Sequence, residues 1–521
     1  MSPPTRKVLS NSCIIIEEYI MKCVSGCKGL ETDICSKSTR CAYASGTRRK
    51  YCRLSSAFKM RKTDCKVTRK LKKKEQVEQS GKRIHQFMKA TKTKRVSEFL
   101  KAVCSDSGIC VAVGTNRNKI LDFFSGFTNF EYATPPIKAI GNPSSNGFVK
   151  EIRYERNGYV SHAVLKSSTR TSSDNLAYEY IVGQYLNKQG KLFPCFLETY
   201  GLFYYKDDAA WKHSMETKSI TTNILKDALI LQPETTDYKK MCAQSKYAAI
   251  LIQHLNGVNT LGDVFGYGKE YKEWFVAREL LQVLYQVYFP LAQMAGKFTH
   301  YDLHDGNVLL YEPVKGKYIQ YHYHINGEIV NFKSRYMVKI IDYGRCYYEQ
   351  DKQNSSTDVH NKLCKEPMCN PCGDNSGFQY MNTYGVLKEN YYICSAIVNP
   401  SHDLRLLSIL KKRVDGINIP AGVAADMYAP LDYLLKNTVY GAGLTRKQQM
   451  AHYVYGTKPN MTSGFTKKKT KVNNVVDAER LLRDMIPFAN QWNETCYKSK
   501  TKLGDIHVYS DGTTPMKFTP A

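Results

Sequence analysis

A polar stretch between residues 300 and 307 has the composition of a site for phosphoryl transfer. It reads His-Tyr-Asp-Leu-His-Asp-Gly-Asn, and an Asp-Tyr-Gly triplet begins 35 residues after Asn307, at Asp342. A hydroxyl that attacks the γ-phosphate of ATP needs an acceptor to orient it and metal ions to neutralise charge on the phosphate oxygens. We therefore expect Asp302 to be the acceptor, and Asn307 and Asp342 to be oxygen ligands of Mg²⁺, or of Mn²⁺ in its place.

The sequence upstream contains further groups for holding ATP, in a set order. Residues 162–166 alternate like a buried strand that ends in Lys166, a point charge placed to reach the α- and β-phosphates. Thirteen residues later, Glu179 lies in a segment with helical spacing, 175–186, and is expected to pair with that lysine. The alternative is that Glu179 belongs to a solvated face of this helix.

Two loops complete the expected nucleotide site. Residues 140–149 form a glycine-containing turn, looser than G-x-G-x-x-G, in which backbone amides can approach phosphates closely. Residues 248–255 form an apolar strand that turns polar, as expected where two lobes meet around an adenine. The residues expected to contact ATP are Gly141, Ser144, Gly147, Val149, Ala163, Lys166, Gln253 and Leu255.

Together these residues resemble the signature of the protein-kinase superfamily, over roughly residues 135–440. The resemblance implies an α+β, bilobal protein-kinase-like fold with a small β-rich N-lobe and a mostly helical C-lobe. It implies that ATP phosphorylates serine or threonine hydroxyls of a protein substrate, with His300 supporting the catalytic loop and Asp403 bracing it. The chain is also similar to the divergent serine/threonine kinases of large nucleocytoplasmic DNA viruses, such as the iridovirus group, which implies a viral or virion-associated protein.

Two departures from the kinase pattern lie in the loop. Tyr301 stands where such kinases carry arginine, and His304 stands where they carry lysine. Without an arginine beside Asp302, regulation through a phosphorylated activation loop is not expected, so constitutive activity is the default. His304 and the missing Ala-Pro-Glu leave open a small-molecule phosphotransferase of the aminoglycoside or choline kinase type. The weak glycine loop leaves open an inactive kinase-like scaffold that binds nucleic acid or virion proteins.

The charge of the chain is large and unevenly distributed. The formal net charge is +28 over 521 residues, and 13 of the 27 residues from 48 to 74 are Lys or Arg. Such a density favours nucleic acid or acidic proteins as partners, or acts as a nuclear-localisation signal, and a solvated linker is the alternative. Because no run of about 18 apolar residues occurs, we expect no membrane span and no secretory segment. The expected location is intracellular, in the host cytoplasm, the virion or the nucleus.

Cysteines gather in two places. Seven of the 17 precede residue 66, where their irregular spacing leaves zinc, disulfides and free thiols open. A second group follows the Asp-Tyr-Gly triplet, and its spacing would let a tetrahedral Zn²⁺ cross-link the loop after this triplet. Free cysteines or a disulfide are the alternatives. The candidate zinc ligands are His360, Cys364, Cys369 and Cys372.

The expected organisation follows from these assignments. A basic Cys-rich module spans 1–70, and a basic linker with a helix at 80–104 spans 71–134. The N-lobe spans 135–255 with an insertion at about 207–245, and the C-lobe with a C-terminal extension spans 256–521. Periodicity predicts C-lobe helices at 272–295, 403–411, 424–436 and 477–492.

Overall fold

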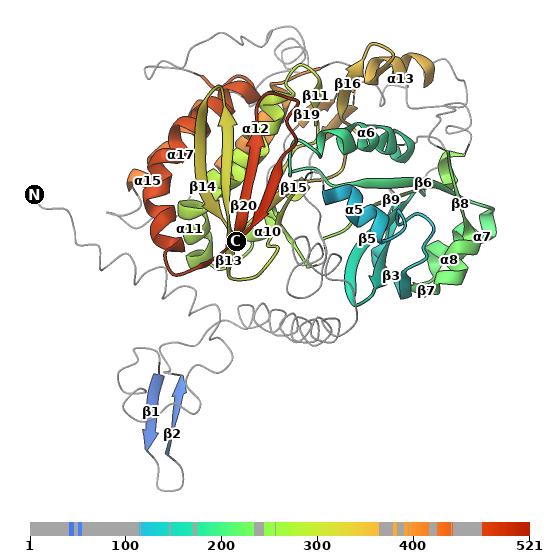
Figure 1. Ribbon diagram of the computed structural model, residues 1–521, viewed down its shortest axis with the longest axis horizontal. Coiled ribbons are helices and arrows are strands. Elements are labelled where there is room, and N and C mark those ends of the chain that lie inside the picture. The colour runs from blue at the N-terminus through green and yellow to red at the C-terminus, as the bar shows by residue number, and fades with distance from the viewer. Residues whose placement is uncertain are drawn as a thin grey trace, which may run out of the picture.

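The chain is an α+β protein in which an antiparallel sheet lies beside a mainly helical region (Figure 1). The computed structural model describes residues 41–45, 50–54, 114, 116–144, 147–169, 175–233, 244–255, 257–363, 379–382, 390–393, 395–396, 398–415, 425–438, 440 and 471–521. The helix expected at 80–104 and most of the Cys-rich module lie outside these residues. Within 1–70, the structure describes a hairpin of β1 (Cys41–Ser45) and β2 (Lys50–Leu54).

The antiparallel sheet has seven strands and contains the strands expected around ATP. Their order is β7-β3-β4-β5-β9-β6-β8, so β5 lies centrally, between β4 and β9. The strands expected at 162–166 and 248–255 are confirmed. The bounds are β3 (Ala133–Ser144), β4 (Gly147–Arg156), β5 (Tyr159–Ser167), β6 (Thr199–Tyr205), β7 (Ser219–Ile220), β8 (Leu229–Leu231) and β9 (Ala248–Gln253).

Helices cover both faces of this sheet because its strands bury side chains on both sides. On β6, Leu202 and Tyr204 pack with α6 (Asn175–Gln189), whereas Phe203 and Tyr205 pack into a second cluster on the opposite face. That second cluster includes side chains of α7 (Asp208–Glu216) and α8 (Thr222–Ala228), and it is completed by the region of α5 (Asn116–Phe123). The described part of the segment expected as an insertion therefore contributes two helices and two short strands to the small region.

The helical region is built around α12 (Leu280–Gln293), which is buried on every side. The other helices are α10 (Leu261–Val264), α11 (Lys269–Arg278), α13 (Ser356–Leu363), α14 (Arg405–Val414), α15 (Ala425–Asn437) and α17 (Val475–Tyr497). The helices expected near 403–411, 424–436 and 477–492 are confirmed. In the described part of the chain, no helix is both long and apolar enough to cross a membrane.

The helix expected at 272–295 is instead two helices that meet at Glu279. This carboxylate is 1% exposed and accepts hydrogen bonds from the hydroxyls of Ser334 and Tyr497, while Arg335 Nε lies 3.7 Å away. Those partners come from distant segments, so local periodicity could not reveal the break.

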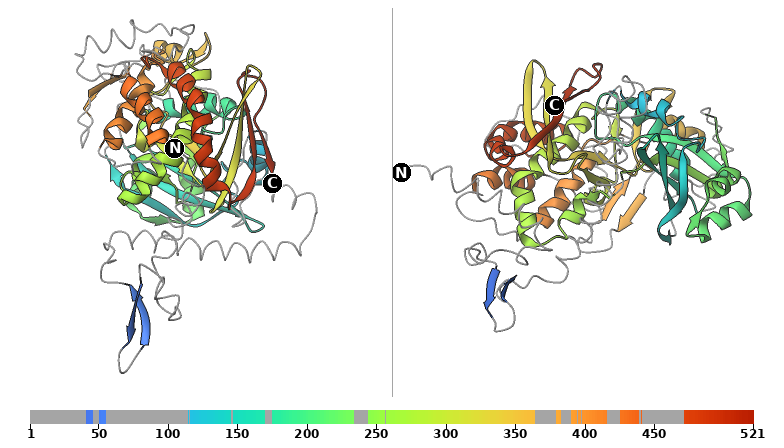
Figure 2. Two further views of the ribbon diagram at one scale, coloured as in Figure 1. Left: turned by 90° about the vertical axis from the view of Figure 1, so that its left-hand side faces the viewer. Right: turned by 60° about the horizontal axis from the view of Figure 1, so that its bottom comes forward.

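The helical region also contains smaller sheets. In a four-stranded sheet, β20 (Thr501–Tyr509) runs parallel to β13, so the C-terminal strands lie beside β13 and β14 (Figures 1 and 2). In a three-stranded sheet, Val308 of β12 pairs with Ile340 of β15, which brings the residues before β12 next to those after β15. The remaining bounds are β10 (Asn259–Thr260), β11 (Phe298–Thr299), β12 (Val308–Tyr311), β13 (Lys317–Ile325), β14 (Glu328–Ser334), β15 (Met337–Ile340), β16 (Tyr347–Asp351), β17 (Asn354–Ser355), β18 (Gln379–Asn382), β19 (Asn390–Ile393) and β21 (Lys517–Pro520).

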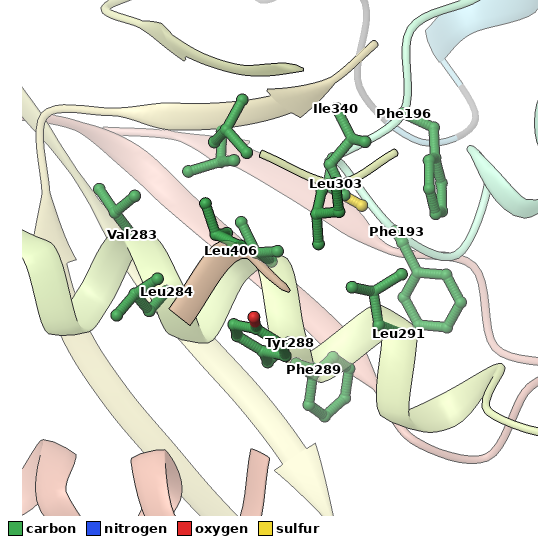
Figure 3. Packing of buried hydrophobic residues seen from close by; sticks show 14 of the residues in the cluster. Phe193, Phe196, Val283, Leu284, Tyr288, Phe289, Leu291, Leu303, Ile340 and Leu406 are labelled. Carbon is green, nitrogen blue, oxygen red and sulfur yellow. The ribbon is translucent and has the colours of Figure 1, made fainter. Parts of the chain in front are cut away.

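The polar loop at 300–307 is anchored by an apolar residue in its middle. Leu303 is fully buried and lies close to Ile340, with Leu406 and Tyr288 nearby (Figure 3). Burying a leucine side chain completely stabilises a fold by about 1.5–3 kcal/mol. The neighbouring residues Asp302 and His304 are therefore held in place by the core.

Candidate active site

The main chain of the 300–307 loop is held by Asp403, which lies in a 3₁₀ turn at His402–Leu404. Its two carboxylate oxygens accept hydrogen bonds from the backbone N–H groups of His300, at 2.8 Å, and Tyr301, at 3.0 Å. Burial raises the pKa of Asp403 to about 7. Tyr301 has a φ of 62°, a left-handed conformation that is rare for a non-glycine residue. The contact predicted between Asp403 and the loop is thus present, and it supports a strained turn directly before Asp302.

His300 links this loop to the segment that contains Asp342. Its Nε2 lies 3.0 Å from the carbonyl oxygen of Ile341, and its Nδ1 accepts a hydrogen bond of 3.3 Å from the backbone N–H of Asp302. Burial lowers the pKa of His300 to about 4, so the ring is neutral at pH 7. A neutral ring with its proton on Nε2 satisfies both contacts.

The carboxylate of Asp302 lies between two arginines. Arg405 Nη1 is 2.8 Å from Oδ1, and Arg345 Nη1 is 3.3 Å from Oδ2. Burial opposes the charge of Asp302, but the two guanidinium groups outweigh it and hold the pKa of Asp302 below its ordinary value. The carboxylate is therefore ionised at neutral pH and able to accept a proton. Sequence reasoning missed both arginines because neither is adjacent to Asp302 in the chain.

Lys166 joins three separate elements at one point. Its Nζ lies 2.7 Å from Glu179 Oε2, on α6, and 2.9 Å from Asp342 Oδ1, after β15. Burial opposes the charge of Lys166, but the carboxylates of Asp342 and Glu179 outweigh it and raise its pKa. Burial also raises the pKa of Glu179, and the ammonium of Lys166 only partly offsets this. The pairing of Lys166 with Glu179 predicted from their spacing is present in the structure.

Asp342 and Asn307 lie at the same end of the β12–β15 pair. The backbone N–H of Ile341 donates to the carbonyl oxygen of Asn307 at 3.1 Å, and Asn307 Nδ2 donates to the carbonyl oxygen of Asp302 at 2.9 Å. Asp342 has a φ of 70°, and Lys166 is the main cause that lowers its pKa to about 2. One ionised carboxylate and one amide oxygen fit Mg²⁺, which often takes only one or two protein ligands besides phosphate oxygens.

Within the described residues, no group of three or more His, Cys, Asp or Glu side chains is arranged to hold a metal ion. The zinc prediction is not addressed by this, because Cys364, Cys369 and Cys372 lie outside the described residues. His360 lies in α13, where the structure describes its backbone alone.

The glycine-containing turn is the hairpin between β3 and β4, closed by the pair Ser144 and Gly147. Gly141 has a φ of +69° at a register shift of β3, and a Cβ there would meet no atom within 4 Å. A Cβ on Gly147 would lie 2.3 Å from the backbone oxygen of Ser167, and its φ is +148°. The close approach of β4 to β5 is therefore sufficient to explain Gly147. Val149 lies beside Lys166 in the β4–β5 register.

The residues expected around adenine come together where β5 pairs with β9. Ala163 pairs with Gln253, and both Ala163 and Leu255 are buried. The Oε1 atom of Gln253 is also buried and has no hydrogen-bond partner among the described residues. A buried acceptor without a partner fits a site that receives a polar ligand, because such an atom otherwise costs about 1–3 kcal/mol.

Comparison with known proteins supports a protein-kinase-like relationship. The chain matches no protein-family model. It is 36% identical over 105 residues to a probable serine/threonine-protein kinase of Dictyostelium discoideum. The match covers 19% of this chain and 8% of that protein, so it concerns a part of each.

Proposed function

We propose that this protein is an ATP-dependent protein kinase with a bilobal kinase-like fold, which phosphorylates serine or threonine hydroxyls. The observation that carries the proposal is the convergence on Lys166 of carboxylates from α6 and from the residues after β15. A chance ion pair needs one partner, whereas Lys166 has two carboxylate partners, and one of them, Glu179, is the helix glutamate that the kinase signature pairs with this lysine. The partial similarity to a probable kinase agrees with it.

The residues of the loop would then perform the transfer. Asp302 accepts a hydrogen bond from the acceptor hydroxyl and takes its proton, as the bond from that oxygen to the γ-phosphorus forms and the bond from phosphorus to the leaving ADP oxygen breaks. Its low pKa keeps it ionised for this role. His300, neutral and hydrogen-bonded on both sides, keeps Asp302 in register with Asp342.

Lys166 would bind the α- and β-phosphates, with Glu179 holding the ammonium in place. Asn307 and Asp342 would hold Mg²⁺, which neutralises charge on the phosphate oxygens when it is bound. Ala163, Gln253 and Leu255 would contact adenine, and the hairpin containing Gly141, Ser144, Gly147 and Val149 would lie over the phosphates. An inactive scaffold would not need Asp302 ionised beside candidate metal ligands, and this supports an active enzyme.

The finer predictions from sequence remain predictions. These are the viral or virion-associated origin, nucleic acid or acidic proteins as partners of the basic N-terminal region, the intracellular location, and Mn²⁺ or Zn²⁺ as further metals.

The test is a panel of acceptors for purified full-length protein with Mg²⁺ and ATP labelled in the γ-phosphate. Dephosphorylated casein and a basic protein represent protein acceptors, and choline and an aminoglycoside represent small hydroxyl compounds. We expect label on serine or threonine of a protein, identified by mass spectrometry, and none with the Asp302→Asn variant. Label on a small molecule alone would replace the proposal with the phosphotransferase alternative, and transfer to nothing would refute the kinase proposal.

A further inference from the structure

The two arginines beside Asp302 differ in burial and in distance. Arg405 is the first residue of α14, its side chain is 3% exposed, and its Nη1 lies 2.8 Å from Oδ1. Arg345 follows the Asp-Tyr-Gly triplet, its side chain is 21% exposed, and its Nη1 lies 3.3 Å from Oδ2. Each carboxylate oxygen therefore has its own guanidinium partner, one in the core and one at its edge.

Placing the cation of Arg405 where it lies would destabilise the fold if Asp302 were not its partner. A cation in the first turn of a helix opposes the helix dipole, and a buried guanidinium needs a carboxylate partner. Two residues earlier, Asp403 binds the main chain of the same loop. The start of α14 thus holds this loop twice, through the backbone before Asp302 and through the carboxylate of Asp302 itself.

Arg345 is held more loosely at the carboxylate. Its carbonyl oxygen accepts a hydrogen bond from the Ser395 hydroxyl at 2.8 Å, which fixes its main chain. Its side chain reaches Oδ2 from a partly exposed position, where solvent weakens an ion pair. Of the two arginines that cover the carboxylate of Asp302, Arg345 is the more exposed, so it is the one that can move into solvent as a hydroxyl approaches.

His304 does not substitute for either arginine. Its Nε2 lies 4.0 Å from Asp302 Oδ1, beyond a hydrogen bond, and its Nδ1 accepts one from the backbone N–H of Gly306. Burial lowers the pKa of His304, so its ring carries no charge at pH 7. The positive charge next to Asp302 therefore comes from Arg345 and Arg405.

We propose that Arg405 is a positioning residue that permanently fixes Oδ1 of Asp302, and that Arg345 is a gate that covers Oδ2 until the acceptor hydroxyl displaces it. This inference rests on the proposed kinase function. It assigns the two oxygens of one carboxylate to different tasks, with Oδ1 held by the fold and Oδ2 offered to the acceptor.

Matched substitutions of the two arginines test the proposal. The measurements are kcat, KM for dephosphorylated casein, KM for ATP, and the pH profile of kcat/KM, on full-length protein. Arg405→Gln is expected to lower kcat at least tenfold, because it misplaces Asp302, and to move the acidic limb of the profile to higher pH, because Asp302 loses a cation. Arg405→Lys keeps the positive charge but not the planar guanidinium group, so it should restore the acidic limb of the pH profile and only part of kcat.

Arg345→Gln is expected to lower KM for casein about two- to fivefold, since a weak competitor is removed, and to lower kcat less than Arg405→Gln does. It should also move the acidic limb of the pH profile to higher pH, because Asp302 loses a cation here too. Binding of Mg²⁺–ATP, measured by calorimetry, shows that each variant is folded. The proposal is overturned if Arg405→Gln binds Mg²⁺–ATP but keeps the wild-type kcat and the wild-type acidic limb of the pH profile. It is also overturned if Arg345→Gln loses as much kcat as Arg405→Gln does. Should Arg405→Gln fail to fold, Arg405→Lys with unaltered kcat would overturn it equally.

Failure of the kinase proposal would look different. In that case the wild-type protein itself would transfer no phosphate to casein, and Asp302→Asn would change nothing. An active wild type with an inactive Asp302→Asn variant upholds the kinase proposal, whatever the arginine variants do.

Discussion

Replacing Lys166 by methionine removes the cation that joins Glu179 and Asp342. Glu179 is the sensitive partner, because its side chain is 3% exposed and its oxygen lies 2.7 Å from Nζ, whereas the side chain of Asp342 is 45% exposed and can be solvated. The variant therefore leaves one buried carboxylate without its counter-charge.

The expected cost follows from that burial. Breaking a buried ion pair by removing one partner costs about 3–5 kcal/mol. Lys166 is itself 29% exposed and burial already raises the pKa of Glu179, so solvent and proton uptake relieve part of the cost. We expect about 3 kcal/mol at pH 8 and less at pH 5, because Glu179 in the variant takes up a proton as the pH falls.

A double variant separates charge from chemistry. Lys166→Met with Glu179→Gln removes both charges at once, so it should recover most of the lost stability and remain inactive, since nothing holds the α- and β-phosphates. The assays are urea unfolding at pH 5 and pH 8 and transfer of labelled phosphate to casein. The reasoning is refuted if Lys166→Met is as stable as the wild type at pH 8, or if the double variant is no more stable than Lys166→Met.

Three further predictions follow from buried charges. Asp403→Asn removes one acceptor from the two backbone N–H groups that it holds, so it should destabilise the protein by about 1–3 kcal/mol in urea unfolding and lower kcat. The control Asp477→Asn, at the start of α17, should also lower stability but leave kcat unchanged. Equal kcat values for the two variants would contradict this prediction. Burial raises the pKa of Glu279 to about 7, so between about pH 4.5 and 7 the folded state binds a proton that the unfolded state releases. The free energy of unfolding should therefore fall as the pH rises through this range. Glu279→Gln should flatten this pH dependence, and an unchanged dependence would argue against a buried carboxyl. Burial lowers the pKa of Lys339 to about 8, so the charge of this ammonium group disfavours folding below that pH. Lys339→Met should therefore raise the free energy of unfolding at pH 7 by about 1–3 kcal/mol. A destabilised variant would show that the 3.2 Å hydrogen bond from Lys339 to the Phe196 carbonyl outweighs the cost of burying the charge.

The elements that sequence predicted well are those whose pattern is local. The strand ending in Lys166 alternates, and the helix with Glu179 has the 3.6-residue period, so both were placed to within a few residues. The spacing of Lys166 and Glu179 predicted their pairing because a kinase signature already encodes that tertiary contact. The contact of Lys166 with Asp342 was not predicted. The break at Glu279 escaped prediction because the hydroxyls that satisfy its carboxylate come from β14 and the end of α17.

Two features of the site depend on the fold and not on local sequence. Arg345 and Arg405 come to Asp302 from separate elements, and the residues adjacent to Asp302 indicated only that arginine was missing there. Gly147 was predicted to let amides approach phosphates, yet the structure gives a steric reason in the close backbone of Ser167. Both contacts are long-range, and a pattern along one chain carries no signal for them.

The most direct test of the central claim is the rate at which purified protein transfers the γ-phosphate of ATP to casein in the presence of Mg²⁺. This rate is compared between wild type, Asp302→Asn and the control Asp477→Asn at the start of α17. The account predicts transfer by the wild type and by Asp477→Asn, and a loss of about 10²-fold or more in Asp302→Asn, which lacks the acceptor for the hydroxyl proton. Equal rates for the wild type and Asp302→Asn would contradict it, because the carboxylate held between Arg345 and Arg405 would then take no part in the reaction.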